Sequence, residues 1–128
     1  MRVLLDTHTF LWWNTEDPQL SARAKEIIAN GLNEIYVSAA TAWEIAIKTS
    51  KGKLKLPDHP MDYFEKRIDL YRFQPLPVQI HHATHVYDLP AHHADPFDRL
   101  LIAQSQLEEL PLITVDGEIK KYEVEIIW

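Results

Sequence analysis

The sequence predicts an α/β fold in which a parallel β-sheet carries helices on both faces. The apolar runs at residues 3–5 and 111–115 are continuous rather than alternating, which is typical of strands buried on both faces. Stretches with helical spacing separate these runs, and a connection through a helix joins parallel strands. The chain has 128 residues, an ordinary length for one domain, so we expect one domain over residues 1–128.

In the first half of the chain, two expected strands alternate with three expected helices. Residues 3–5 form the first strand, and a helix from Ser21 to Asn30 follows, with the serine as its N-cap. "EIYVS" at 34–38 is rich in strand-forming residues and ends where "AATAWEIAIKTSKGK" at 39–53 begins as a helix. "MDYFEKRIDLY" at 61–71 places its apolar residues at helical spacing.

The second half begins with "FQPLPV", which can form only a short strand at a sheet edge. Pro75 and Pro77 lack the N–H group that a sheet ladder needs. The other expected elements are helices at residues 79–89 and 95–110 and strands at residues 111–115 and 123–127.

Composition excludes several classes of protein. The chain has no cysteine, so it forms neither disulfides nor thiolate-bound zinc sites. Its formal net charge of -6 argues against non-specific binding of nucleic acid through long-range attraction. The N-terminus lacks the apolar core of a signal peptide, and no run of about 18 apolar residues occurs. We therefore expect a cytoplasmic protein without a membrane segment.

Four acidic residues are expected at one edge of the sheet. Asp6 directly follows the first strand, and Asp116 directly follows "LITV". Glu44 lies in the helix after the second strand, and Asp98 lies in the first turn of the helix before the fourth strand. If the first and fourth strands are neighbours, these carboxylates converge where open parallel sheets bind ligands. Oxygen ligands alone suit Mg²⁺ or Mn²⁺.

Each of these residues also has a structural explanation. Asp95 to Asp98 is favourable helix-start chemistry, and Asp116 stands before a glycine, as in an ordinary turn. Glu44 could pair with Lys48 one helical turn later. Asp6 could cap a following helix. The metal site is favoured because the four acids are explained together by it.

Four segments resemble the PIN-domain ribonucleases, specifically the VapC-like toxins of bacterial type II toxin–antitoxin pairs. They are "VLLDTHTFLWW", "VSAATAWEIAIKTSKGKL", "LPAHHADPFDRLLIAQ" and "LITVDGEIKKYEVEIIW". The resemblance spans Met1 to Trp128 and implies a three-layer α/β/α fold with a parallel sheet of about five strands in the order 3-2-1-4-5. It also implies a Mg²⁺- or Mn²⁺-dependent endoribonuclease that acts on RNA, forms a homodimer and is silenced by a cognate antitoxin.

Carried over residue by residue, the family's catalytic and metal-binding acids are Asp6, Glu44, Asp98 and Asp116. Thr114, two residues before the last acid, has a supporting role in this comparison. Asp95 belongs to the "DPFDR" form of the motif. We favour Asp98 over Asp95 as the closer metal ligand.

An acidic ribonuclease needs a local basic surface to hold RNA. Lysines gather just beyond Glu44, and an arginine adjoins Asp98, at Lys48, Lys51, Lys53, Lys55 and Arg99. The alternative is a solvated helix end. Trp12 and Trp13 are candidates either for a partner surface or for core packing.

Histidines suggest a rival function, a zinc or iron hydrolase. His81 and His85 have i, i+4 spacing, and His92 and His93 lie near Asp95, but no "HExxH"-type combination occurs. A phosphatase with an aspartate nucleophile is disfavoured because a second aspartate two residues after the first is absent. A third alternative is a PIN-like binding module that has lost catalysis, which the presence of all four acids disfavours.

Overall fold

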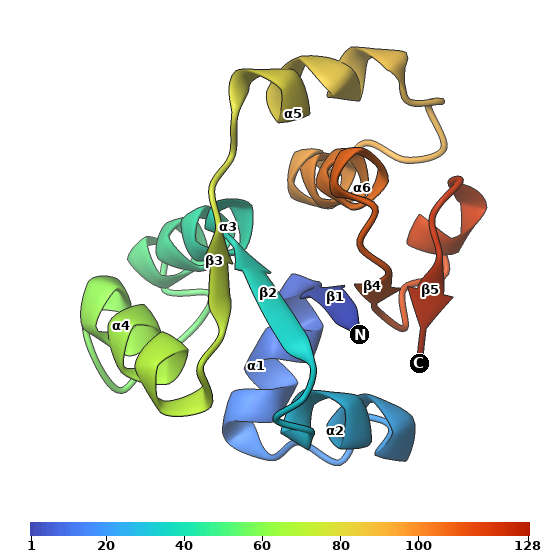
Figure 1. The fold of residues 1–128 in the computed structure, drawn as a ribbon. Coiled ribbons are helices and arrows are strands. Elements are labelled where there is room, and N and C mark those ends of the chain that lie inside the picture. The colour runs from blue at the N-terminus through green and yellow to red at the C-terminus, as the bar shows by residue number, and fades with distance from the viewer.

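A computed structural model describes residues 1–128 and contains a parallel sheet of five strands in the order β3-β2-β1-β4-β5 (Figure 1). The expected sheet and strand order are confirmed. The strands are β1 (Arg2–Leu5), β2 (Glu34–Ser38), β3 (Gln74–Leu76), β4 (Leu112–Ile113) and β5 (Ile126–Ile127).

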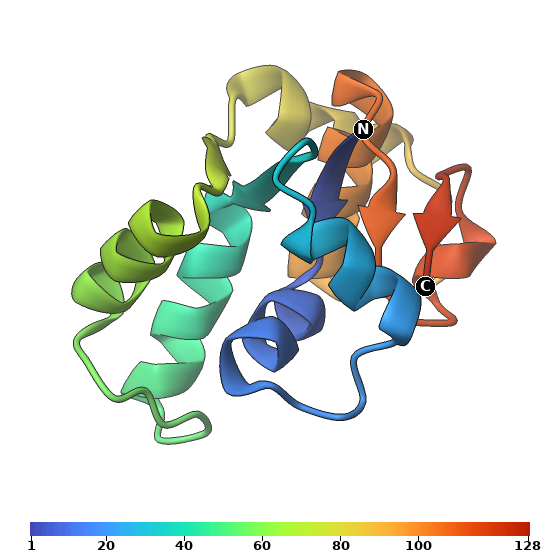
Figure 2. The same ribbon diagram turned by 60° about the horizontal axis from the view of Figure 1, so that its bottom comes forward.

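Helices cover both faces of this sheet, which gives the expected three layers. In Figure 2, α1 and α2 lie on the near side of the sheet and α6 lies behind it. The helices are α1 (Thr7–Thr15), α2 (Ala22–Ala29), α3 (Ala39–Ser50), α4 (Pro60–Tyr71), α5 (Ile80–His85) and α6 (Pro96–Glu108), with short 3₁₀ helices at Val86–Asp88 and Ile119–Lys121. None of these helices is both long and apolar enough to cross a bilayer.

The two faces of β1 belong to different hydrophobic clusters. Val3 and Leu5 pack into a cluster with Phe10 of α1, whereas Leu4 packs into a second cluster with Leu101 of α6. All three strand residues are fully buried. The continuous apolar run therefore marks a central strand, as the sequence predicted.

Helix α1 was absent from the sequence prediction. Its sequence "THTFLWWNT" is rich in threonine and tryptophan, which are weak helix formers, and has no clear polar face. Two features stabilise it. Asp6 is its N-cap and accepts the Thr9 N–H at 2.7 Å, and the buried Phe10 ring stacks on Phe64 at a centroid distance of 5.0 Å.

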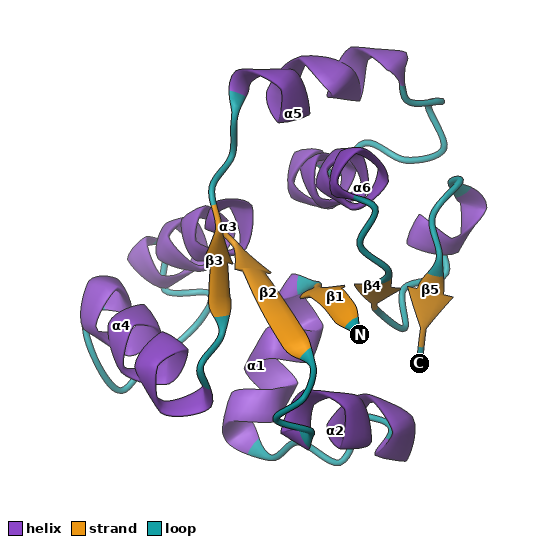
Figure 3. Ribbon diagram, viewed as in Figure 1, coloured by secondary structure: helices purple, strands orange, loops and turns teal.

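Several elements are shorter than the sequence predicted. The helix expected at residues 79–89 is split into α5 and a 3₁₀ turn, and β4 and β5 have two residues each (Figure 3). Trp12 and Trp13 are partly buried and pack against the first cluster, in agreement with the core-packing alternative.

Candidate active site

The end of β1 fixes the Asp6 carboxylate in a buried position. Its side chain is an N-cap, and it also accepts a hydrogen bond from the Thr114 hydroxyl just after β4. Burial raises the pKa of the Asp6 carboxyl above its ordinary value, although the hydrogen bonds from Thr114 and Thr9 act in the opposite direction. Asp6 can therefore be both an N-cap and a candidate metal ligand, because capping α1 fixes its carboxylate at the sheet edge.

Thr114 links the ends of β1 and β4. Besides donating to Asp6, its Oγ1 accepts the backbone N–H of Asp116 at 3.0 Å. Asp116 Oδ1 in turn accepts the backbone N–H of Glu118 at 2.8 Å, which is the turn geometry that the following glycine suggested. Only one carboxylate oxygen of Asp116 is used in this way, so the other is available to a ligand.

Glu44 lies on the buried side of α3 and has a partner for each oxygen. Its Oε1 accepts the Thr7 hydroxyl at 2.7 Å, and its Oε2 lies 2.5 Å from Lys48 Nζ. The i, i+4 pair considered from the sequence is therefore present. Because Thr7 follows Asp6 directly, this contact ties Glu44 to the end of β1.

Asp98 lies in the first turn of α6, where Asp95 caps the helix as predicted. Asp95 Oδ1 accepts the Asp98 N–H at 2.9 Å, and His93 Nε2 is 3.3 Å from Asp98 Oδ2. Burial, followed by the negative charges of Asp95, Asp116 and Asp6, raises the pKa of Asp98 to about 6. The charges of Asp95, Asp116 and Asp6 thus act on Asp98, although the ligand atoms of Asp6, Asp98 and Asp116 do not all lie within 4.8 Å of one another.

The donor set of this site fits a hard divalent cation. Asp6, Asp98 and Asp116 come from the ends of β1 and β4 and the start of α6, and all offer carboxylate oxygens. A bound cation would relieve the unfavourable charge on Asp98. Glu44 is paired with Lys48 and is linked to the end of β1 by its hydrogen bond with Thr7.

Sequence comparison identifies the family to which this chain belongs. The family model described as "PIN domain" matches residues 3–125. The chain belongs to the PIN domain family. The PIN domain is 26% identical over 121 residues to Ribonuclease VapC22 of Mycobacterium tuberculosis (strain ATCC 25618 / H37Rv). The alignment covers 94% of this chain and 91% of the relative. The resemblance to VapC-like members of the family is thereby confirmed.

Solved structures share the fold of this PIN domain. VapBC2 from Rickettsia felis bound to a DNA fragment from its promoter matches with a TM-score of 0.73 and 15% identity, covering 99% of this chain and 98% of that chain. DNA-bound VapBC from Salmonella typhimurium matches with a TM-score of 0.72 and 16% identity, covering 99% and 97%. At such identities the likeness is one of fold.

Arg99, for which an RNA contact is expected, is hydrogen-bonded to the loop before α6 in the PIN domain. Its guanidinium donates to the backbone carbonyls of Val86, Leu89 and Pro90 and to the Tyr122 hydroxyl, at 2.8 to 3.4 Å. These bonds hold the loop before α6 against the C-terminal segment. The sequence missed them because they depend on where a distant loop passes. Lys51 and Lys53, by contrast, are exposed at the end of α3.

The histidines form one group with metal-ligand spacing. His81, His82 and Glu108 place their ligand atoms within 4.8 Å of one another, and His85 is not in this group. His82 Nδ1 accepts the Gln79 N–H at 3.0 Å, so Nε2 carries the proton and donates to Glu108 at 2.9 Å. This buried histidine caps α5, and both of its ring nitrogens are hydrogen-bonded to groups of the protein. His92 is exposed, and its ring packs edge-on against Tyr122.

Asp98 should give the PIN domain a measurable pH dependence in EDTA. The folded pKa of about 6 lies above the ordinary aspartate value of about 4, so the destabilising effect of the Asp98 charge is absent below about pH 4 and complete above about pH 6. Asp98→Asn should therefore gain stability relative to wild type by about 1–2 kcal/mol across that interval, after allowance for solvent screening. Urea unfolding at both ends of the interval measures this. A constant difference between the two proteins would contradict it.

Proposed function

We propose that this PIN domain is a Mg²⁺- or Mn²⁺-dependent endoribonuclease and the toxin of a toxin–antitoxin pair. The observation that carries the proposal is the placement of the Asp6, Asp98 and Asp116 carboxylates at the carboxyl edge of the sheet, where the charges of Asp116 and Asp6 act on Asp98. The name of the relative VapC22 supports ribonuclease activity. The VapBC complexes with the same fold support an antitoxin partner. RNA and such a partner both fit a cytoplasmic location and a single-domain chain.

In this mechanism Asp6, Asp98 and Asp116 would hold the metal, with Glu44 beside them. When bound, the ion supplies Lewis-acid stabilisation of the phosphodiester and lowers the pKa of a water for in-line attack. Thr114 and the Thr9 N–H hold the two oxygens of Asp6 in fixed directions, so that carboxylate needs little reorganisation. Asp95 supports Asp98 by starting α6.

Lys48 joins the acidic site to a basic surface. Its Nζ contacts Glu44, yet 42% of its side chain is exposed, so it can also meet an RNA phosphate. Lys51 and Lys53 follow it on the exposed end of α3 and its loop. We expect these lysines to hold the RNA backbone, and a homodimer to place two such surfaces in one assembly.

The proposed function is tested by cleavage and by metal binding on the same protein. Purified wild type should cleave a mixed RNA pool in Mg²⁺ or Mn²⁺ and not in EDTA. Mg²⁺ at about ten times its dissociation constant should stabilise the wild type by about 1.4 kcal/mol and raise the melting temperature by several degrees.

Two variants make the thermal result specific. Asp98→Asn should lose most of the Mg²⁺-induced rise, because a ligand and a repelling charge are both removed. Asp69→Asn, an exposed aspartate on α4, should keep the full rise. An equal rise in all three proteins would count against the site, and absence of both cleavage and metal binding would favour a PIN-like binding module.

A further inference from the structure

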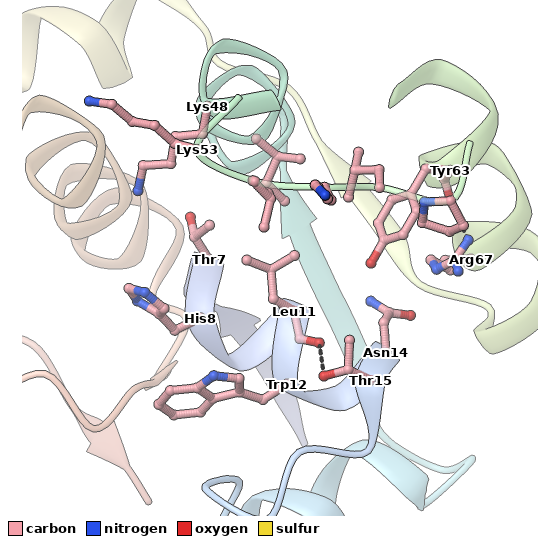
Figure 4. A pocket seen from close by; sticks show the side chains of 15 residues that line it. Thr7, His8, Leu11, Trp12, Asn14, Thr15, Lys48, Lys53, Tyr63 and Arg67 are labelled. Atoms are coloured by element: carbon pink, nitrogen blue, oxygen red, sulfur yellow. Dashed lines mark hydrogen bonds between the residues drawn. The ribbon is translucent and has the colours of Figure 1, made fainter. Parts of the chain in front are cut away.

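A cavity of about 560 Å³ lies beside the acidic site, between α1, the α3–α4 connection and α4 (Figure 4). Its volume is in the range of small-molecule pockets. The apolar part of its wall consists of Leu11, Trp12, Ile45, Leu54, Leu56 and Pro57. None of these residues belongs to the set of carboxylates proposed to bind metal.

The charge of the cavity is opposite to that of the whole protein. Lys48, Lys53, Lys55 and Arg67 line it, and its fifteen lining residues include no aspartate or glutamate. The chain as a whole carries a formal charge of -6. A local basic cavity on an acidic protein selects an anionic ligand.

Tyr63 brings a phenol hydroxyl to this cavity. The residue is only 3% exposed, and the Arg67 guanidinium lies 3.7 Å from its ring centroid. In Figure 4 the hydroxyl points toward the side-chain amide of Asn14. Burial raises the pKa of the Tyr63 phenol, so the group stays protonated and can both donate and accept.

Asn14 adds an unpaired acceptor. Its Nδ2 donates to the Phe10 carbonyl at 2.8 Å, but its Oδ1 is closed off from solvent without a hydrogen-bond partner. A buried acceptor left unpaired costs about 1–3 kcal/mol, which a donor on a ligand could recover. Phenol and amide together form a polar edge among apolar walls.

Two residues of the cavity wall connect the cavity to Glu44. Thr7 and Lys48 both line it, and both are hydrogen-bonded to Glu44. An anionic polymer that places one unit in the cavity can therefore place a neighbouring unit at the carboxylates.

We propose that this cavity binds one unpaired nucleobase of the RNA substrate. The inference rests on the proposed function and adds a base-selecting site to it. The apolar walls contact the faces of the base, Tyr63 and Asn14 bind its hydrogen-bonding edge, and the lysines contact adjoining phosphates. A nucleotide supplies all three features in one unit. An acidic peptide would also be negatively charged. It would need one side chain to fill the apolar cavity and bond Tyr63 and Asn14, and separate carboxylates to pair with the lysines.

Nuclear magnetic resonance with ¹⁵N-labelled protein in EDTA tests this without cleavage. AMP, GMP, CMP and UMP are titrated separately, with inorganic phosphate as the reference. We expect shifts at the Asn14 side-chain amide and at the backbone amides of Leu54 to Leu56, and clear preference for one base. Tyr63→Phe should weaken binding of that nucleotide about tenfold. Tyr87→Phe, which alters a 92% exposed tyrosine, should leave it unchanged.

Three outcomes would overturn the proposal. Equal binding of all four nucleotides and of phosphate, unaffected by Tyr63→Phe, would mean that the lysines bind phosphate alone. Absence of shifts at the cavity would exclude nucleotides there. An acidic peptide alternating glutamate with phenylalanine is titrated in parallel, and its binding in place of the nucleotides would assign a peptide site. Base-selective binding without any RNA cleavage would keep the cavity assignment and overturn the proposed nuclease.

Discussion

Asp6→Asn should lower the rate of metal-dependent RNA cleavage by about 10²–10³-fold while the protein stays folded. Asparagine has the shape of aspartate and keeps an oxygen for the Thr9 N–H, so the N-cap of α1 persists. Its amide faces the Thr114 hydroxyl, which can accept as well as donate. The change therefore removes a charge from the site with little disturbance of α1. Initial cleavage rates in Mg²⁺, with circular dichroism of the same samples, measure the effect.

The control separates loss of a ligand from loss of structure. Asp69→Asn carries the same chemical change on an exposed part of α4 and should cleave at the wild-type rate. In EDTA, the free energy of unfolding of Asp6→Asn should be at least as large as that of wild type, because burial already disfavours the charged form of Asp6. Wild-type cleavage by Asp6→Asn would place the activity elsewhere or in a contaminant.

The local part of this site could be predicted from the sequence. Asp6 directly follows β1, Asp116 lies three residues after the end of β4, and the Asp95 to Asp98 segment carries the composition of a helix start. Each signal lies within a few neighbouring residues, so propensity and periodicity suffice to detect it. The order of the strands came only from the family resemblance, since periodicity does not say which strands are neighbours.

Long-range contacts could not be predicted in this way. Helix α1 was missed because it is stabilised by Asp6 and by the packing of Phe10, not by its own composition. The lysine pattern suggested RNA binding but gave no indication of a cavity, which forms only when α4 packs beside α1. The hydrogen bonds of Arg99 could not be predicted because its carbonyl partners lie 9 to 13 residues earlier in the chain.

Arg99→Lys should destabilise the protein by about 3 kcal/mol, because several hydrogen bonds to the loop of residues 86–90 are lost together. Lysine keeps the charge but lacks the planar fork that reaches Val86, Leu89, Pro90 and Tyr122 at once. Urea unfolding in EDTA gives the free energy of unfolding, and hydrogen exchange should show faster exchange in residues 86–93. Arg23→Lys, on the exposed side of α2, is the matched control and should match wild type.

The same variant distinguishes the loop role of Arg99 from an RNA contact. The Tyr122 hydroxyl that accepts from Arg99 also lies 2.8 Å from His93 Nδ1, and His93 Nε2 contacts Asp98. Loss of Arg99 should therefore loosen His93 and lower the cleavage rate through the position of Asp98. If Arg99 instead acted on phosphates, Arg99→Lys would keep wild-type stability, and only RNA affinity and its salt dependence would fall. Comparing stability with RNA affinity in this one variant decides between the two roles.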